Sequence, residues 1–329
     1  MDGREPFGET PQGERVHRLT IEGGGLCARI LTFGAVVQDL RLAGHAAPLV
    51  LGFEALSHYL DHSVYFGAIV GRYANRIGGA RFILDGERFD TDANDNGNTL
   101  HGGRAGLDRR VWHIAAAGAD FVTLALRDPA GTMGFPGNLD IACTYRLKPP
   151  ATLAVELFAT TDRATLCNLA HHSYFNLAGE GSGTIDNHLL QIQADDYVPS
   201  ADDMTLLGRL DPVTAANDFR QARRIGDALS ELHKQHGDTY LVRSRTRSGL
   251  ETLARVAEPS SGRVMEVLST KRFLQFYTGQ FLDGAVSGKS GRPYGARAGL
   301  CLECQGYPDG VNHPEIDDIV LRPGESYEQ

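Results

Sequence analysis

The sequence lacks the features that would place this protein in a membrane or on a nucleic acid. No apolar run in its 329 residues approaches the roughly 20 residues that span a bilayer. The N-terminal stretch MDGREPFGETPQGERV is polar and has no apolar core of the kind a secretory signal needs. Positive charge is in deficit, since 32 Lys and Arg stand against 41 Asp and Glu and give a net charge of −9. This balance disfavours nucleic acids and anionic membranes as partners.

Cysteine is scarce as well, and no glycine-rich phosphate loop is present. Five scattered cysteines, an odd number, favour reduced thiols and a cytoplasmic location over a disulfide framework. Cys301 and Cys304 have the spacing of some zinc and redox sites. On a strand, however, residues three apart face opposite sides, and no second pair completes a four-cysteine site. We interpret both as packed thiols.

What the chain does contain is a long series of short apolar stretches separated by Gly, Asp and Asn. Turn dipeptides such as Asp85-Gly86 between such stretches are typical of antiparallel sheets. The number of stretches predicts an all-β fold, a large antiparallel β-sandwich with two large sheets packed face to face. Helical spacing is confined to 217–236 and to a short segment at 53–60. We expect residues 1–14 to be a disordered lead and residues 15–329 to form a single domain.

Two histidines stand side by side in LAHHSYFNLAG, residues 169–179. Because successive residues of a strand point to opposite faces, one pocket can receive only one of these imidazoles. Leu177 shares the face of His171, whereas Asn176 shares the face of His172. The alternation therefore favours His172 for a polar site.

Other segments contain more polar and charged side chains than a sheet needs for folding. VGRYANRIGGARF contains Arg72, Asn75 and Arg76, NTLHGG contains His101, and LECQ contains Glu303. Each of these residues alone is typical of a structural role, such as a salt-bridged arginine or a hydrogen-bonded histidine. Their occurrence together in one all-β chain favours a site for sugars, whose hydroxyls both donate and accept hydrogen bonds.

These segments resemble, in the same order, those of the aldose 1-epimerases, also called galactose mutarotases. The blocks that carry the resemblance are LGFEALSHYL, YFGAIVGRYANRIGGARFILDG, NTLHGG, HHSYFNLAG, LQFYTGQFLDG and LECQGYPDGVNHPE with VLRPGESY. The resemblance runs from about Thr32 to Tyr327. It implies an antiparallel β-sandwich with an open sugar cleft, no metal and no redox cofactor. A monosaccharide is then the expected partner, with the chain a monomer or a homodimer.

The family interconverts the α and β anomers of free aldoses such as galactose and glucose by opening and reclosing the sugar ring. The resemblance makes Glu303 the base that takes the proton of the C1 hydroxyl, and His172 the acid that protonates the ring oxygen. It implies substrate binding by five residues: Asn75, Arg76, His101, Asp238 and Gln275.

Two departures from the family pattern stand out. His171 replaces a usual Asn, and Asp238 lies in a shortened block, QHGDTYLV, that lacks the following histidine. A nearby carboxylate favours an imidazolium. One direction of the reaction must start with Glu303 ionised and His172 protonated, and the pair can hold these complementary states near neutral pH.

Two alternatives concern related substrates. An epimerase-like enzyme for phosphorylated hexoses would need extra basic groups, for which Arg72 and Arg104 are available. Glycoside hydrolysis needs two carboxylates, which Glu303 and Asp238 could supply.

Two further alternatives are functions of a different class from sugar epimerisation or hydrolysis. One is a sugar-binding module without catalysis. The other is a metal enzyme that uses His101, His172 and Glu303 as ligands.

Overall fold

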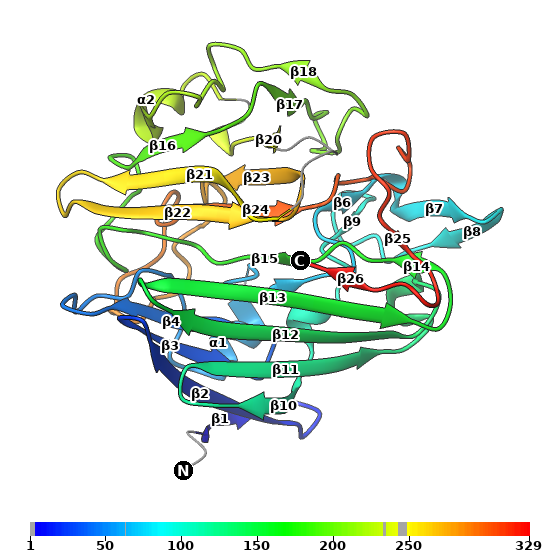
Figure 1. Ribbon diagram of the computed structural model, residues 1–329, viewed down its shortest axis with the longest axis horizontal. Helices are drawn as coiled ribbons and strands as arrows, with labels where there is room; N and C mark the ends of the chain where they lie inside the picture. Colours follow the sequence, from blue (N-terminus) through cyan, green and yellow to red (C-terminus); the bar gives the residue numbers. More distant parts are fainter. Residues whose placement is uncertain (1–3, 63, 233–234, 243–248) are drawn as a thin grey trace.

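The computed structural model describes residues 4–62, 64–232, 235–242 and 249–329, and its architecture is built almost entirely from strands (Figure 1). Every pairing between named strands in these ranges is antiparallel, which confirms the predicted all-β antiparallel class. The helical elements are α1 (Leu56–His62), α2 (Ile225–Ala228) and the 3₁₀ turns η1 (Gly78–Ala80), η2 (Leu107–Arg109) and η3 (Thr132–Gly134). In the described ranges, no helix has the length and apolar character needed to cross a membrane.

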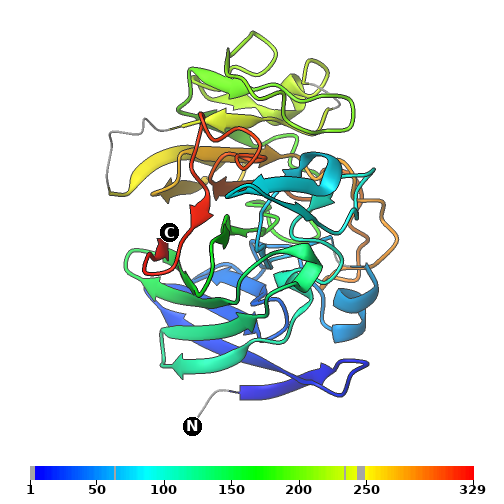
Figure 2. The same ribbon diagram turned by 90° about the vertical axis from the view of Figure 1, so that its right-hand side faces the viewer.

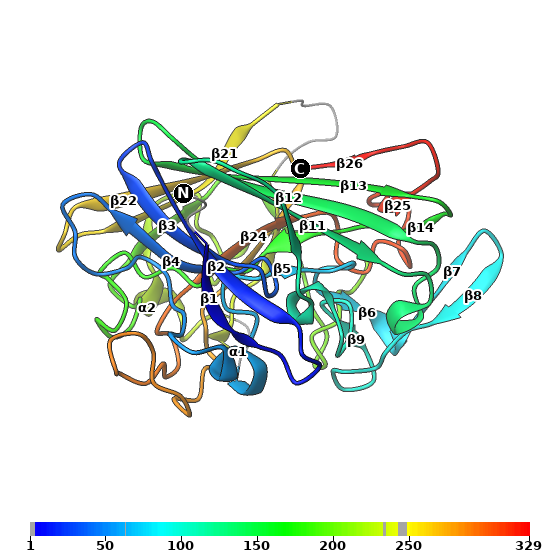
Figure 3. The same ribbon diagram turned by 90° about the horizontal axis from the view of Figure 1, so that it is seen from below.

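One half of the molecule consists of two sheets that lie face to face, seen as separate layers in Figure 2 and crossing one another in Figure 3. The first has the order β1 (Arg4–Glu9), β2 (Arg15–Gly23), β3 (Leu26–Leu31) and β4 (Val37–Leu42). The second has the order β10 (His113–Ala117), β11 (Phe121–Asp128), β12 (Leu139–Lys148), β13 (Thr152–Thr161) and β26 (Tyr327–Glu328). Ile21 and Ile30 from the first sheet share one buried cluster with Leu124 and Ile141 from the second. This layer of alternating apolar side chains is the sandwich core.

The other half contains two more sheets with a core of their own. One has the order β18 (Asp211–Pro212), β17 (Asp196–Val198), β20 (Thr239–Leu241), β23 (Phe273–Tyr277) and β24 (Cys301–Gln305). The other has the order β19 (Arg223–Arg224), β16 (Leu189–Ile192), β21 (Glu251–Glu258) and β22 (Arg263–Ser269). Leu190, Val256, Leu274 and Leu302 meet in its buried cluster. In the described residues, the expected pair of large sheets is thus divided into four sheets of four or five strands, beside four two-stranded ones.

Four two-stranded ladders complete the described strands and carry several residues of interest. They pair β5 (Ile69–Val70) with β15 (Ala170–His171), β6 (Arg76–Ile77) with β9 (Thr99–Leu100), β7 (Arg81–Leu84) with β8 (Glu87–Asp90), and β14 (Thr165–Leu166) with β25 (Val320–Leu321). The hairpin of β7 and β8 confirms the predicted turn, because Asp85 and Gly86 both have positive φ there, 51° and 81°.

The predicted disordered lead is wrong for residues 4–9, which form strand β1 along the edge of β2. The polar composition of these residues gave no indication of a strand. Its order comes from the ladder with β2, from the Phe7 ring packed 6.2 Å from that of Tyr59, and from Glu5 accepting a 2.6 Å hydrogen bond from Arg18.

The helix predicted over 217–236 is also wrong for most of its length. Residues 223–224 pair with β16 as β19, and in the described part of the segment helical structure is confined to α2 and to single turns after it. Residues 233 and 234 lie outside the described ranges. Leu229 and Leu232 are buried as the spacing suggested, but Ala222 is exposed on an extended segment. Tertiary pairing with β16 overrides the local helical pattern. The helix expected over 53–60 is present as α1, shifted by about one turn.

Candidate active site

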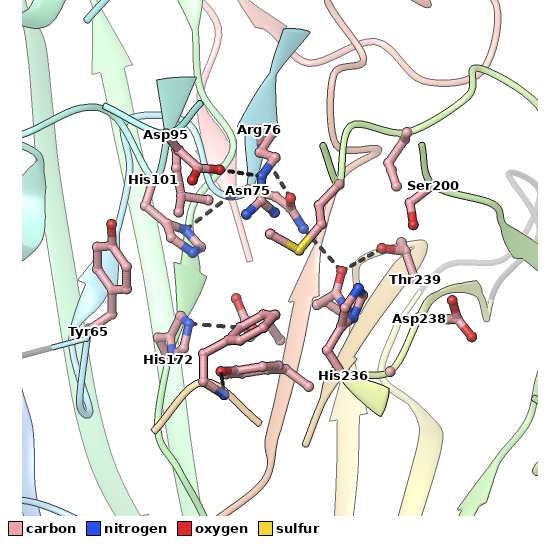
Figure 4. A pocket seen from close by; sticks show the side chains of 18 of the residues that line it. Tyr65, Asn75, Arg76, Asp95, His101, His172, Ser200, His236, Asp238 and Thr239 are labelled. Carbon is pink, nitrogen blue, oxygen red and sulfur yellow. Dashed lines mark hydrogen bonds and ion pairs between the residues drawn. The ribbon is translucent and has the colours of Figure 1, made fainter. Parts of the chain in front are cut away.

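A cavity of about 370 Å³ opens between the two halves, where β20, β23 and β24 approach β6, β9 and the segment after β15 (Figure 4). Its size is in the range of small-molecule sites. All seven side chains that the sequence analysis assigned to catalysis or substrate binding line it: Asn75, Arg76, His101, His172, Asp238, Gln275 and Glu303.

Strand register builds one wall of this pocket. Thr239 of β20 pairs with Gln275 of β23, and Gln275 pairs with Glu303 of β24, so the three residues form a row across the sheet. The Thr239 hydroxyl donates a 2.6 Å hydrogen bond to Gln275 Oε1, which fixes the amide in the middle of the row. Glu303 therefore lies at the end of this row and lines the pocket from β24, the last strand in the order of its sheet.

Opposite this wall, His172 continues the ladder that β15 makes with β5. Its N–H donates to Ala68 O, and its carbonyl accepts from the Gly67 N–H. Its Nε2 lies 3.6 Å from Glu303 Oε1, and its Nδ1 lies 3.6 Å from the Cys301 thiol. The pocket thus brings together one imidazole and one carboxyl group.

Burial controls the protonation of this pair. The His172 and Glu303 residues are only 3% and 2% exposed. Burial raises the pKa of Glu303 to about 8, with Arg76 opposing the shift, and it lowers the pKa of His172 to about 3. Burial thus works against the ionised Glu303 and protonated His172 with which one direction of the reaction starts. Loss of hydration disfavours charge on both groups and favours the proton of the pair on Glu303.

His171 and His172 face opposite sides, as alternation predicts. His171 Nε2 lies 2.9 Å from Ser173 Oγ, and its ring lies 5.9 Å from that of Tyr145, a member of the sandwich core. Burial lowers the pKa of His171 to about 4. Its neutral ring is part of the packing behind the site.

His101 has its tautomer fixed by the backbone. The Asn75 N–H donates a 3.2 Å hydrogen bond to His101 Nδ1, and burial holds the pKa of His101 well below its ordinary value. A neutral ring that accepts at Nδ1 carries its proton on Nε2. His101 is thereby a hydrogen-bond donor to whatever occupies the pocket.

The same hydrogen bond bears on metal binding. Donor atoms of His101, His172 and Glu303 all lie within 4.8 Å of one another, close enough to hold an ion. A metal on His101 Nε2 would require that nitrogen to lose its proton while Nδ1 still accepts from the backbone. Because a neutral imidazole has only one free lone pair, this arrangement fits a hydrogen-bond donor better than a metal ligand.

Asn75 and Arg76 are held in place by neighbouring polar groups. The Asn75 side chain donates a 3.1 Å hydrogen bond to Gln275 Oε1 and accepts one of 2.9 Å from the Arg76 N–H. Arg76 Nε donates a 2.7 Å hydrogen bond to Asp95. Within the described ranges, the two terminal nitrogens of Arg76 make no hydrogen bond, which leaves them to face a ligand.

Asp238 lies at the other end of the pocket, beside Thr239 (Figure 4). It is 6% exposed, and its Oδ2 accepts a 3.3 Å hydrogen bond from the side chain of Asn217. The aspartate assigned from the shortened block QHGDTYLV therefore does reach the pocket.

The chain is similar to known proteins along nearly its whole length. The model of the aldose 1-epimerase family matches residues 17–329. This chain is an isomerase of the aldose 1-epimerase family. The galactose mutarotase of Rattus norvegicus is 39% identical over 98% of this chain and 95% of its own length. The aldose 1-epimerase of Escherichia coli is 34% identical over 96% and 94%. A solved aldose epimerase homologue from C. elegans has a TM-score of 0.88 at 29% identity, covering 94% of this chain and 96% of its own.

Two arginines that the sequence brought to attention lie outside the pocket of this epimerase. Arg72 is buried in an ion pair with Asp128 at 2.6 Å and donates to the carbonyls of Pro136 and Gly137. Arg104 is largely exposed and pairs with Asp92. Neither guanidinium lines the cavity.

Sequence reasoning missed several residues that complete the epimerase pocket. The Tyr65 ring lies 4.4 Å from that of His101 and 5.5 Å from that of His172, forming a wall behind both (Figure 4). Its φ of 66° is rare for a bulky residue and is typical of functional sites. Asp95 and Ser200 were also missed. Tyr65 begins the block YFGAIVGRYANRIGGARFILDG, but no pattern in the sequence marks it, Asp95 or Ser200 as a pocket residue, because their approach to the pocket depends on tertiary structure.

Proposed function

We propose that this enzyme interconverts the α and β anomers of free aldohexoses, with galactose and glucose as substrates. The observation that carries the proposal is the separation of 3.6 Å between His172 Nε2 and Glu303 Oε1 in a pocket lined by hydrogen-bonding groups. A positioned acid or base accelerates proton transfer by roughly 10²–10⁴-fold each. Ring opening already proceeds slowly in water, so one acid and one base suffice.

Ring opening starts from the tautomer in which the proton of the pair has moved to His172. Glu303 takes the proton of the C1 hydroxyl, the C1–O5 bond breaks as the C1 carbonyl forms, and O5 takes the proton of His172. The pair then has its proton on Glu303, the arrangement that burial favours. After the C1 aldehyde turns, O5 attacks its other face, and the two protons return by the same routes to give the other anomer.

The remaining pocket residues hold the sugar so that only C1 needs to move. We propose His101 as a donor near the ring oxygen, and Arg76, Asn75 and Gln275 as partners of sugar hydroxyls. Gln275 is already engaged at Oε1 by two donors, and its Nε2 donates 2.8 Å to Phe276 O. One N–H is left for the substrate, so Gln275 acts chiefly by ordering its neighbours.

Asp238 supplies a carboxylate acceptor for a hydroxyl at the other end of the ring. This carboxylate accepts from Asn217, and the group that lies 3.6 Å from Glu303 across the pocket is the His172 imidazole. That combination favours mutarotation over glycoside hydrolysis, which needs two carboxyl groups flanking the bond. Free sugars are favoured over phosphorylated ones because Arg72 and Arg104 are engaged elsewhere.

We further propose a cytoplasmic enzyme, monomeric or homodimeric, in which residues 15–329 act as one domain. The C-terminal strand supports a single domain, because β26 returns from the second half to pair with β13 of the first.

Polarimetry tests the function directly. Added enzyme is expected to accelerate the change in optical rotation of freshly dissolved α-galactose and α-glucose well above the buffer rate. A faster reaction on glucose 6-phosphate than on glucose would favour the phosphorylated-hexose alternative, and release of nitrophenol from an aryl galactoside would favour hydrolysis.

A further inference from the structure

The Ser200 hydroxyl at the pocket has no hydrogen-bond partner among the described residues. Ser200 lines the cavity, and its Oγ is buried and makes no hydrogen bond with any described residue. Buried hydroxyls are nearly always hydrogen-bonded, because leaving one without a partner destabilises the fold. A group of this kind at a ligand pocket indicates a partner that arrives with the ligand.

Strand register brings the segment that carries Ser200 beside the segment that carries Asp238, and both residues line the pocket. Val198 at the end of β17 pairs with Thr239 at the start of β20. Because the strands are antiparallel, the chain that leaves Val198 runs beside the residues that precede Thr239. Figure 4 shows Ser200 and Asp238 on the side of the pocket away from Tyr65, His101 and His172.

The loop that carries Ser200 is anchored at both ends of its turn. Ser200 forms a bridge with Leu206, and Asp203 Oδ1 accepts hydrogen bonds from the N–H and hydroxyl of Thr205, at 3.0 and 2.6 Å. Asp203 Oδ2 also accepts a 3.2 Å hydrogen bond from Asn98 Nδ2.

Asn98 belongs to the opposite side of the pocket. Its Oδ1 accepts a 2.8 Å hydrogen bond from the Gly79 N–H, just after β6. The contact between Asn98 and Asp203 therefore fixes the Ser200 loop to the strands that carry Arg76. Ser200 is held in position before a sugar binds, which is the property of a pre-formed binding group.

We propose that Ser200 is a further sugar-binding residue, which together with Asp238 recognises a hydroxyl on C3 or C4 of the aldose. The assignment rests on the proposed function, because it takes C1 and O5 to lie at Glu303 and His172. In a pyranose ring C1 and O5 are adjacent, and C3 and C4 lie across the ring from them. A carboxylate that accepts beside a hydroxyl that donates or accepts can satisfy both the hydrogen and the lone pairs of one sugar hydroxyl.

Kinetics of Ser200→Ala test the assignment. Loss of one neutral hydrogen bond is expected to raise the KM for galactose about fivefold with kcat unchanged. Ser326→Ala, which removes an exposed hydroxyl between β25 and β26, serves as the matched control and should retain the wild-type KM. Asp203→Ala, which releases the loop from Asn98, should raise KM in the same direction.

Deoxy sugars identify the hydroxyl. The effect of Ser200→Ala should vanish with either 3-deoxygalactose or 4-deoxygalactose, whichever lacks the partner hydroxyl, and should persist with 2-deoxygalactose. A KM for Ser200→Ala equal to that of the wild type, or an increase by the same factor with all three deoxy sugars, would overturn the proposal. Ser200→Cys, which preserves the size of the side chain, should reproduce the rise in KM if the alanine variant is poorly folded.

Calorimetry separates this proposal from the proposed function. Galactose binding to Glu303→Gln, with and without Ser200→Ala, reports on the hydroxyl contact in the absence of turnover. About fivefold weaker binding in the double variant supports the Ser200 contact, and equal binding contradicts it. A wild type that binds galactose without accelerating mutarotation would overturn the proposed function alone.

Discussion

His172 Nε2 lies 3.6 Å from Glu303 Oε1, and the two side chains are almost completely shielded from water. Removal from water disfavours charge on both groups, so burial favours their one proton on Glu303. Transfer of that proton to His172 leaves the net charge of the pair unchanged. Changing between the tautomers for ring opening and ring closure therefore requires no proton from bulk water.

Replacing Glu303 by Gln removes the base and preserves the shape of the side chain. We expect Glu303→Gln to lower kcat for galactose by on the order of 10²–10⁴-fold while galactose still binds. Polarimetry measures the first effect and isothermal calorimetry the second. Glu266→Gln, at an exposed position on β22, should behave as the wild type. Retention of full activity by Glu303→Gln would remove Glu303 from the mechanism.

The pH dependence should follow the proton of the pair. A carboxyl whose pKa is raised to about 8 binds its proton below that pH and loses it above. We therefore expect kcat/KM to decline as the pH rises through about 8, because the pair then lacks the proton that O5 must receive. The measured midpoint belongs to the pair as a whole. Subtraction of the uncatalysed rate at each pH is the necessary control, and a rate that keeps rising after subtraction would contradict this assignment.

Alternation along single strands was sufficient to select part of the site. It predicted that His172, and not His171, faces the polar pocket, and the structure places the two rings on opposite sides. It also predicted opposite faces for Cys301 and Cys304, which pack in or against different apolar clusters. These outcomes depend only on the two-residue period of a strand.

Features that depend on long-range pairing could not be predicted in this way. Ser200 and Tyr65 reach the pocket because separate segments meet there, and the short β1 strand is ordered by a neighbouring strand and by Tyr59. The preference of the proton for Glu303 could not be predicted from the sequence for a related reason. The sequence indicates that a carboxylate is near an imidazole, but only the closed tertiary structure shows how little water reaches either group.

Asp238 is expected to act on substrate affinity. A hydrogen bond to a charged group contributes more than a neutral one, so Asp238→Asn should raise the KM for galactose by on the order of 10- to 100-fold and change kcat less. The Asn side chain can still accept from Asn217, which limits structural damage. Asp227→Asn, at an exposed position on α2, is the matched control. An unaltered KM in Asp238→Asn would show that Asp238 does not contact the sugar.

Exhaustive chelation tests the metal alternative. Because His101 accepts the Asn75 N–H at Nδ1, its Nε2 carries a proton and is suited to donate to the sugar. We expect kcat/KM to be unchanged after dialysis against EDTA, and to remain unchanged when zinc or magnesium is restored at micromolar concentration. Loss of activity on chelation with recovery on addition of one metal would favour the metal enzyme instead.

Arg72 and Arg76, only four residues apart, should differ completely in their effects. Arg72 is fully buried against Asp128, so Arg72→Met leaves that buried carboxylate with only Arg110, at 3.2 Å, as an ion-pair partner, and should lower the free energy of unfolding by up to about 3–5 kcal/mol. Arg88→Met breaks an exposed pair with Asp90 and should cost less than about 1 kcal/mol. Urea unfolding followed by circular dichroism measures both. Arg76→Met, by contrast, should leave the fold stable and raise the KM for galactose, because the Arg76 guanidinium faces the pocket. If Arg72→Met were as stable as the wild type and lost only activity, the structural role assigned to Arg72 would be wrong, and a place for Arg72 in substrate binding would have to be reconsidered.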